Sequence, residues 1–170
     1  MRVSLACLIW FASSGCSSLR LVKADPPPVA ALGQPPAGWA QVCVLRPHWV
    51  AWGMTLAVRD NGNLVGATKG NTYFCYFAAP GWHDVATRED DPGPWRDVKS
   101  LLVAVLPGQR LYLHHHIYPF GIFSVEWLDP TTAAELLGAC GYRILAGGAD
   151  PREPQRPPVP IAPGTPSPPR

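Results

Sequence analysis

The chain has 170 residues, which is enough for one domain of ordinary size with tails. Its 47% hydrophobic residues, including 7 Trp, exclude a wholly disordered chain, and its 21 Pro and 16 Gly exclude a helix-rich fold. The formal net charge is only +2, so we expect no nucleic-acid partner.

The N-terminus has the pattern of an export signal. After a basic second residue, the apolar run from Val3 to Ala12 suits a secretory signal but is shorter than the roughly 20 residues of a membrane-spanning helix. Small residues precede Cys16 and resemble the bacterial lipobox, in which the signal is cut just before a lipid-modified cysteine. Ser13 departs from this motif, which usually has an aliphatic residue there, and plain secretion is the alternative. We predict a lipoprotein signal peptide over residues 1–15 and lipidation of Cys16.

The residues that follow Cys16 predict where the anchor holds the protein. No Asp stands beside this cysteine, so by resemblance to lipoproteins of enteric bacteria the chain lacks an inner-membrane retention signal. Two or more acyl chains give stable membrane attachment. We therefore expect a cell-envelope protein on the periplasmic face of the outer membrane.

Proline is concentrated in two segments that flank the central part of the chain. Residues 16–38 are predicted to be the lipid anchor and a semi-rigid spacer, because Pro favours extended polyproline II. Residues 148–170 have little apolar bulk and are predicted to be a disordered tail. The tail is either simply solvated, a ligand for a Pro-recognising groove, or a tether to an anionic wall polymer.

The central residues 39–147 show short β-rich runs separated by turn residues. The strongest turn signal is Asn61-Gly62, since both central positions of a type I′ hairpin need positive φ. Trp49 and Trp52 flank a loop, which they either anchor or turn into an exposed aromatic patch for binding. The predicted strands cover 41–46, 54–58, 64–68, 72–77, 82–87, 98–106, 110–117 and 123–128.

The pattern changes after the last of these runs. Asp129 is a candidate N-cap, followed by Pro130 at the first helical position, and Gly138 or Gly141 is expected to end the helix. Regularly spaced strands with turn signals argue for a mainly β fold. We predict an antiparallel β-sandwich or small barrel with one short C-terminal helix.

The order of these motifs resembles the DUF2846 domain family over roughly residues 39–137. The segments that carry the resemblance are an apolar strand ending in Arg46-Pro47, the Asn61-Gly62 turn with its preceding strand, the aromatic run Thr72-Tyr73-Phe74, and Pro80-Gly81-Trp82-His83. The family is bacterial, commonly lipid-anchored and without an assigned biochemical function. The resemblance implies a location and a sandwich-like domain, and no catalytic residues.

Three consecutive histidines stand within the predicted strand 110–117. Alternation places His114 and His116 on one face and His115 on the other, which continues the apolar core face. Two histidines at i and i+2 on a strand are able to share a metal ion, with His48 or His83 as a third ligand. The alternative is an exposed polar sheet face without a ligand.

The positions of the five cysteines predict different roles for them. Cys7 leaves with the signal and Cys16 is the lipid site, so Cys43, Cys75 and Cys140 enter an oxidising compartment. One disulfide with one free thiol is the simplest outcome, and three buried thiols are the alternative. The pairing is not fixed by the sequence; our preferred bridge joins Cys43 or Cys75 to Cys140.

Together these features favour a non-enzymatic envelope lipoprotein without a cofactor. The chain has no GxSxG, P-loop or dinucleotide fingerprint. The leading hypothesis is a binding or structural module for another envelope protein or a wall polymer. The alternative is a metal-binding lipoprotein that uses the His114 and His116 strand face.

Overall fold

Strand β2 (Ala40–Arg46) shows why this sequence folds into two layers. All seven of its residues are buried, as expected for a near-continuous apolar run covered on both faces. A computed structural model describes residues 19–25, 35–48, 50–90, 100–118 and 122–147. The predicted signal peptide, Cys16, Trp49 and the predicted tail lie outside these ranges.

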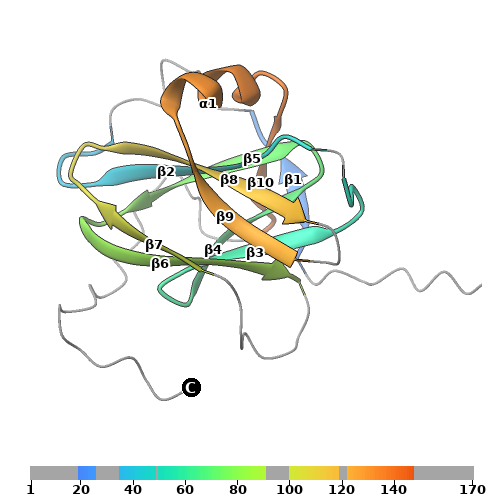
Figure 1. The fold of residues 1–170 in the computed structure, drawn as a ribbon, viewed down its shortest axis with the longest axis horizontal. Helices are drawn as coiled ribbons and strands as arrows, with labels where there is room; N and C mark the ends of the chain where they lie inside the picture. The colour runs from blue at the N-terminus through green and yellow to red at the C-terminus, as the bar shows by residue number, and fades with distance from the viewer. Residues whose placement is uncertain (1–18, 26–34, 49, 91–99, 119–121, 148–170) are drawn as a thin grey trace, which may run out of the picture.

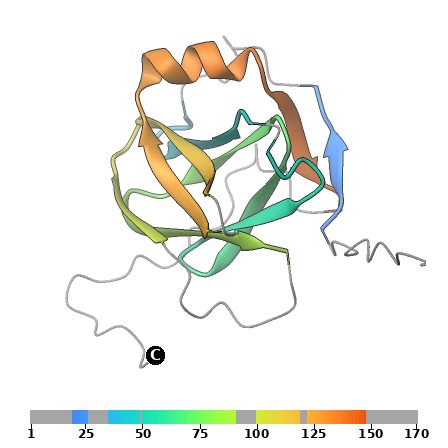
Figure 2. The ribbon, with the colours of Figure 1, turned by 45° about the vertical axis from the view of Figure 1, so that its right-hand side comes forward.

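The described strands form two sheets, and one short helix lies over the larger sheet (Figures 1 and 2). The larger sheet has the order β1-β10-β5-β2-β8-β9, and its further members are β1 (Leu21–Lys23), β5 (Thr72–Ala78), β8 (Arg110–Tyr118), β9 (Ile122–Leu128) and β10 (Gly141–Leu145). The smaller sheet has the order β4-β3-β6-β7, made of β3 (Thr55–Asp60), β4 (Asn63–Lys69), β6 (Gly81–Glu89) and β7 (Ser100–Val105). The fold is mainly β and consistent with the predicted sandwich, without a closed barrel.

Two features of the larger sheet differ from the expectation. Strand β2 pairs with β8 in parallel, and β10 pairs with β5 in parallel, whereas the other pairings are antiparallel. Strand β1 lies within residues 16–38, so the spacer prediction is wrong for Leu21–Lys23. These three residues pair with β10 and extend the sheet, because their backbone groups find partners there.

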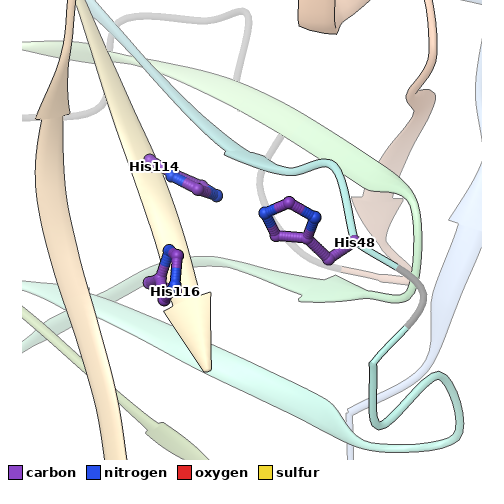
Figure 3. A group of neighbouring side chains, drawn as sticks. All are labelled: His48, His114 and His116. Atoms are coloured by element: carbon purple, nitrogen blue, oxygen red, sulfur yellow. The ribbon is translucent and has the colours of Figure 1, made fainter. Parts of the chain in front are cut away.

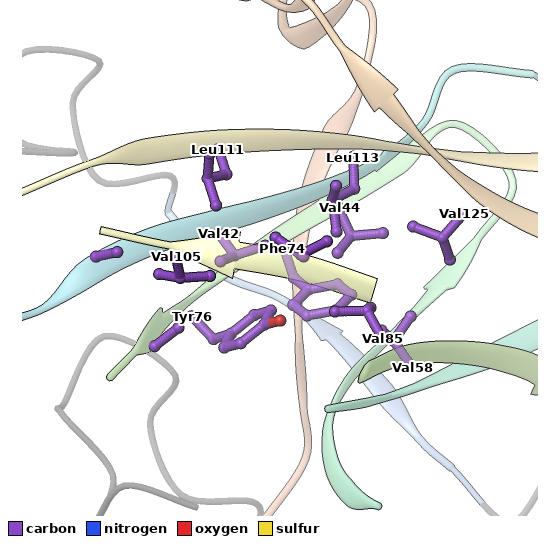
Figure 4. Close-up of a cluster of buried hydrophobic side chains, with 13 residues drawn as sticks. Val42, Val44, Val58, Phe74, Tyr76, Val85, Val105, Leu111, Leu113 and Val125 are labelled. Atoms are coloured by element: carbon purple, nitrogen blue, oxygen red, sulfur yellow. The ribbon is translucent and has the colours of Figure 1, made fainter. Parts of the chain in front are cut away.

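The core lies between the sheets and is filled by alternate residues of the strands. Figure 4 shows Val42 and Val44 of β2 among the aliphatic and aromatic side chains of both layers. The other side of β2 carries Cys43 and Leu45, which pack in a second cluster under the helix. Strand β2 therefore supports both layers of packing.

Helix α1 (Pro130–Leu137) begins as predicted. The carboxylate of Asp129 accepts hydrogen bonds from the amides of Thr131 and Thr132, and Gly138 is the C-cap. Leu136 and Leu137 pack against the second cluster on the outer face of the larger sheet. Among the described residues, no helix is long and apolar enough to cross a membrane.

Candidate metal centre

The triple histidine lies on β8 with the predicted alternation. His115 is fully buried on the core face together with Leu113, whereas His114 and His116 are half-buried on the opposite face. The period-two geometry of a strand thus separates one structural histidine from a pair with available nitrogens.

His48 joins this pair from another part of the chain. The parallel pairing of β2 with β8 sets Leu45 beside His114, so the chain that leaves β2 passes over this face of β8. Figure 3 shows the three imidazoles facing a common space. One ring nitrogen from each of His48, His114 and His116 lies within 4.8 Å of the others. The side chain of His48 is exposed. The sequence offered His48 or His83 as a third ligand, and the fold brings His48 to the pair of His114 and His116.

Arg46 holds the segment that carries His48. Its guanidinium is fully buried and donates to three backbone oxygens: Val50 at 2.8 Å, Ala51 at 2.7 Å and Met54 at 2.8 Å. Burial lowers the pKa of Arg46 to about 10, so it remains charged at neutral pH. A planar cation with several fixed donors is suited to this arrangement of carbonyls. We call residues 47–54 the Arg46 loop.

The electrostatics of the cluster keep the imidazole of His114 neutral. Burial, followed by the neighbouring His116 and His48, lowers the pKa of His114 to about 4. Nε2 of His114 and Nδ1 of His116 are buried and have no hydrogen-bond partner among the described residues. Orphaned buried nitrogens are costly unless something binds them, and a metal ion is one such partner.

A carboxylate lies next to the histidines without belonging to the group of possible ligands. Glu126 of β9 is the register partner of His114, and it accepts hydrogen bonds from Tyr118 at 2.5 Å and Ser124 at 2.9 Å. These two bonds, with a smaller contribution from the histidines, lower its pKa. Its negative charge would therefore offset part of the charge of a cation bound by the histidines.

Three imidazoles are the ligand set of several transition-metal sites. Neutral imidazole suits Zn²⁺, Cu²⁺ and Ni²⁺, and three protein ligands leave a coordination position open for another group. Two zinc–nitrogen bonds of about 2.0–2.1 Å put their nitrogens at most about 4.2 Å apart, so a pair near the 4.8 Å limit has to move closer on metal binding. The exposed His48 side chain is the part of the cluster free to approach the other two.

The remaining two histidines are structural. His115 contacts the hydroxyls of Thr68 and Thr87, and burial lowers its pKa to about 3, which keeps it neutral. His83 of β6 lies in the smaller sheet, and Asp60 and the Ala79 carbonyl each accept from one of its ring nitrogens. Because both ring nitrogens of His83 already donate to protein acceptors, His83 does not serve as a third metal ligand.

The disulfide joins cross-strand neighbours. Cys43 and Cys75 are register partners on β2 and β5 and form a disulfide, whereas Cys140 is free. The preferred bridge to Cys140 is therefore wrong. Cys140 lies half-buried in the same cluster, where burial raises its pKa to about 11 and keeps the thiol protonated.

The chain was compared with protein families, with curated proteins and with solved structures. No family model, no curated protein and no solved structure matches the chain. The function of the chain is therefore inferred from its own residues.

Sequence reasoning found His114 and His116 but missed two residues that build their surroundings. In the sequence Arg46 is only the last residue of an apolar run before Pro47, and its contacts depend on how the following loop folds back. Glu126 depends on the pairing of β8 with β9, which no local pattern specifies. The sequence also predicted a Trp loop, and Trp52 of that loop is 70% exposed.

Proposed function

We propose that this protein is a lipid-anchored envelope protein that binds a transition-metal ion through His48, His114 and His116. The observation that carries the proposal is the convergence of three imidazole nitrogens from two separate segments within 4.8 Å. The unpartnered buried nitrogens of His114 and His116 support it. The protein is proposed to hold or pass on the ion without catalysing a reaction.

The envelope location has independent support from the N-terminal sequence. The predicted export signal and the small residues before Cys16 agree with each other. Export also agrees with a chain that carries a disulfide. A module that binds an envelope protein or a wall polymer is compatible with the same location.

Metal binding is tested on the full-length chain purified without a polyhistidine tag. Titration calorimetry with Zn²⁺ and with Cu²⁺ is expected to show one ion per chain. The variant H114A/H116A is expected to lose at least about tenfold in affinity, and H48A alone is expected to weaken binding as well, because each removes a ligand.

Two comparisons make the metal test decisive. Glu135→Gln on the exposed face of the helix serves as a control and should bind like the unmodified chain. Circular dichroism shows whether each variant keeps its strands. Unchanged affinity in a folded H114A/H116A variant contradicts the proposed site and leaves the envelope-binding module as the better hypothesis.

Lipidation is tested in cells with a palmitate analogue. Cys16→Ala is expected to abolish labelling and to leave an unprocessed precursor, because the thiol is the proposed acceptor of the diacylglycerol. Cys7→Ala, a change inside the predicted signal, is the matched control and should be labelled normally. Labelling that persists in Cys16→Ala shows that the lipid is attached elsewhere.

A further inference from the structure

A cleft with a different chemistry lies apart from the three histidines. It has a volume of about 570 Å³ and is lined by Leu21, Trp52, Lys69, Asn71, Thr72 and Arg143. This volume falls in the range of about 300–1,000 Å³ that is usual for small-molecule sites. Its walls come from β1, the Arg46 loop, the β4–β5 turn and β10, so distant segments build it.

Trp52 provides an aromatic wall that is held in place but not covered. Its side chain is 70% exposed, yet the pyrrole part of the indole packs on Gly70. A Cβ at Gly70 would lie 2.5 Å from Cδ1 of the indole, so this approach requires a glycine. Arg46 fixes the backbone beside it through the carbonyl of Ala51. A large, fixed and exposed ring is typical of binding surfaces.

Positive charge also gathers at the cleft. Lys69 and Arg143 line the cleft, and Lys23 is the register partner of Arg143 in the β1–β10 pair. Like charges directly opposite each other on a sheet repel. None of the three forms an ion pair with any residue that the structure describes. An anion bound in the cleft would relieve this repulsion.

We propose that this cleft binds an anionic carbohydrate. The apolar face of a sugar ring would lie on the indole of Trp52, because that ring offers apolar surface beside polar groups. A carboxylate or phosphate of the sugar would bind Arg143 and Lys69, with the guanidinium able to donate two parallel hydrogen bonds. The Asn71 side chain, which is exposed at the rim, supplies both a donor and an acceptor for hydroxyls.

Titration calorimetry on the full-length chain tests this proposal with defined probes. The probes are a trigalacturonate, its methyl-esterified neutral counterpart, glucose 1-phosphate and adenosine monophosphate. The trigalacturonate or the sugar phosphate is expected to bind at least about tenfold more tightly than the neutral sugar, and added salt should weaken that binding. The two charged sugars distinguish carboxylate from phosphate as the preferred group.

Variants place the binding in the cleft. Trp52→Ala and K69A/R143A are each expected to weaken binding of the charged sugar at least about tenfold. The matched control Trp82→Ala removes an exposed indole on β6, outside the cleft lining, and should bind normally. H114A/H116A should also bind normally, which separates this site from the metal site.

Four results would overturn the assignment. The first is equal affinity for the charged and neutral sugars, and the second is binding that Trp52→Ala and K69A/R143A leave unchanged. The third is tighter binding of adenosine monophosphate than of either charged sugar, which would make the cleft a nucleotide site. Absence of binding by every probe also contradicts the proposal.

Discussion

Arg46→Ala is expected to destabilise the protein by about 3–5 kcal/mol, because the change removes a fully buried side chain and leaves three backbone carbonyls without their charged donor. The same change should weaken metal binding at least about tenfold, since His48 stands in the loop that Arg46 holds. Urea unfolding followed by fluorescence measures the first effect, and titration calorimetry with Zn²⁺ measures the second.

Two further variants distinguish the effect of the guanidinium geometry from the effect of the positive charge alone. Arg46→Lys keeps the charge but not the planar fork of donors, and it should fall between Arg46→Ala and the unmodified chain in both measurements. Arg20→Ala removes an exposed guanidinium and should change stability by less than about 0.5 kcal/mol. If Arg46→Lys folds and binds Zn²⁺ as tightly as the unmodified chain, the guanidinium geometry does not position His48.

Asp60→Asn is expected to destabilise the protein by about 3 kcal/mol near pH 6, because the change breaks a buried charged pair. Burial lowers the pKa of His83, but the hydrogen bond and charge of Asp60 and the bond to the Ala79 carbonyl outweigh it and raise the pKa overall. A proton on each ring nitrogen is what these two acceptors require. Urea unfolding of both chains measures the difference in the free energy of unfolding.

The pH dependence of the difference in unfolding free energy shows whether His83 is protonated in the folded protein. A histidine whose pKa is raised on folding contributes its stability fully below its unfolded pKa of about 6.5 and loses it as the pH rises through the folded pKa. The destabilisation by Asp60→Asn should therefore shrink between pH 6 and pH 9. Glu89→Gln, an exposed carboxyl on β6, is the control for general charge effects. A difference that grows with pH means that His83 is neutral in the folded protein.

The local part of the fold could be predicted from the sequence because turns and strands follow local rules. Asn61 and Gly62 both have positive φ, as the type I′ turn requires, and the Asp129 cap starts the helix. The sequence did not predict strands β1 and β10, because each is short and only partly buried. Their stability comes from pairing with each other and, for β10, with β5, which no local pattern reveals.

The candidate site shows the same division between local and tertiary information. Alternation along β8 predicts that His114 and His116 share a face, and the structure places them so. The choice of His48 over His83 depends on β2 lying parallel to β8, a contact between segments about 70 residues apart in the chain. The pairing of Cys43 with Cys75 likewise follows from strand register, which the sequence leaves open.

X-ray absorption at the zinc edge of the loaded, tag-free full-length chain tests the central claim most directly, because it counts the ligands of the ion. We expect three imidazole nitrogens at about 2.0–2.1 Å from the zinc ion, falling to one in H114A/H116A. A zinc ion that binds with no more than one imidazole in the unmodified chain, or with the same shell in both chains, contradicts the three-histidine site.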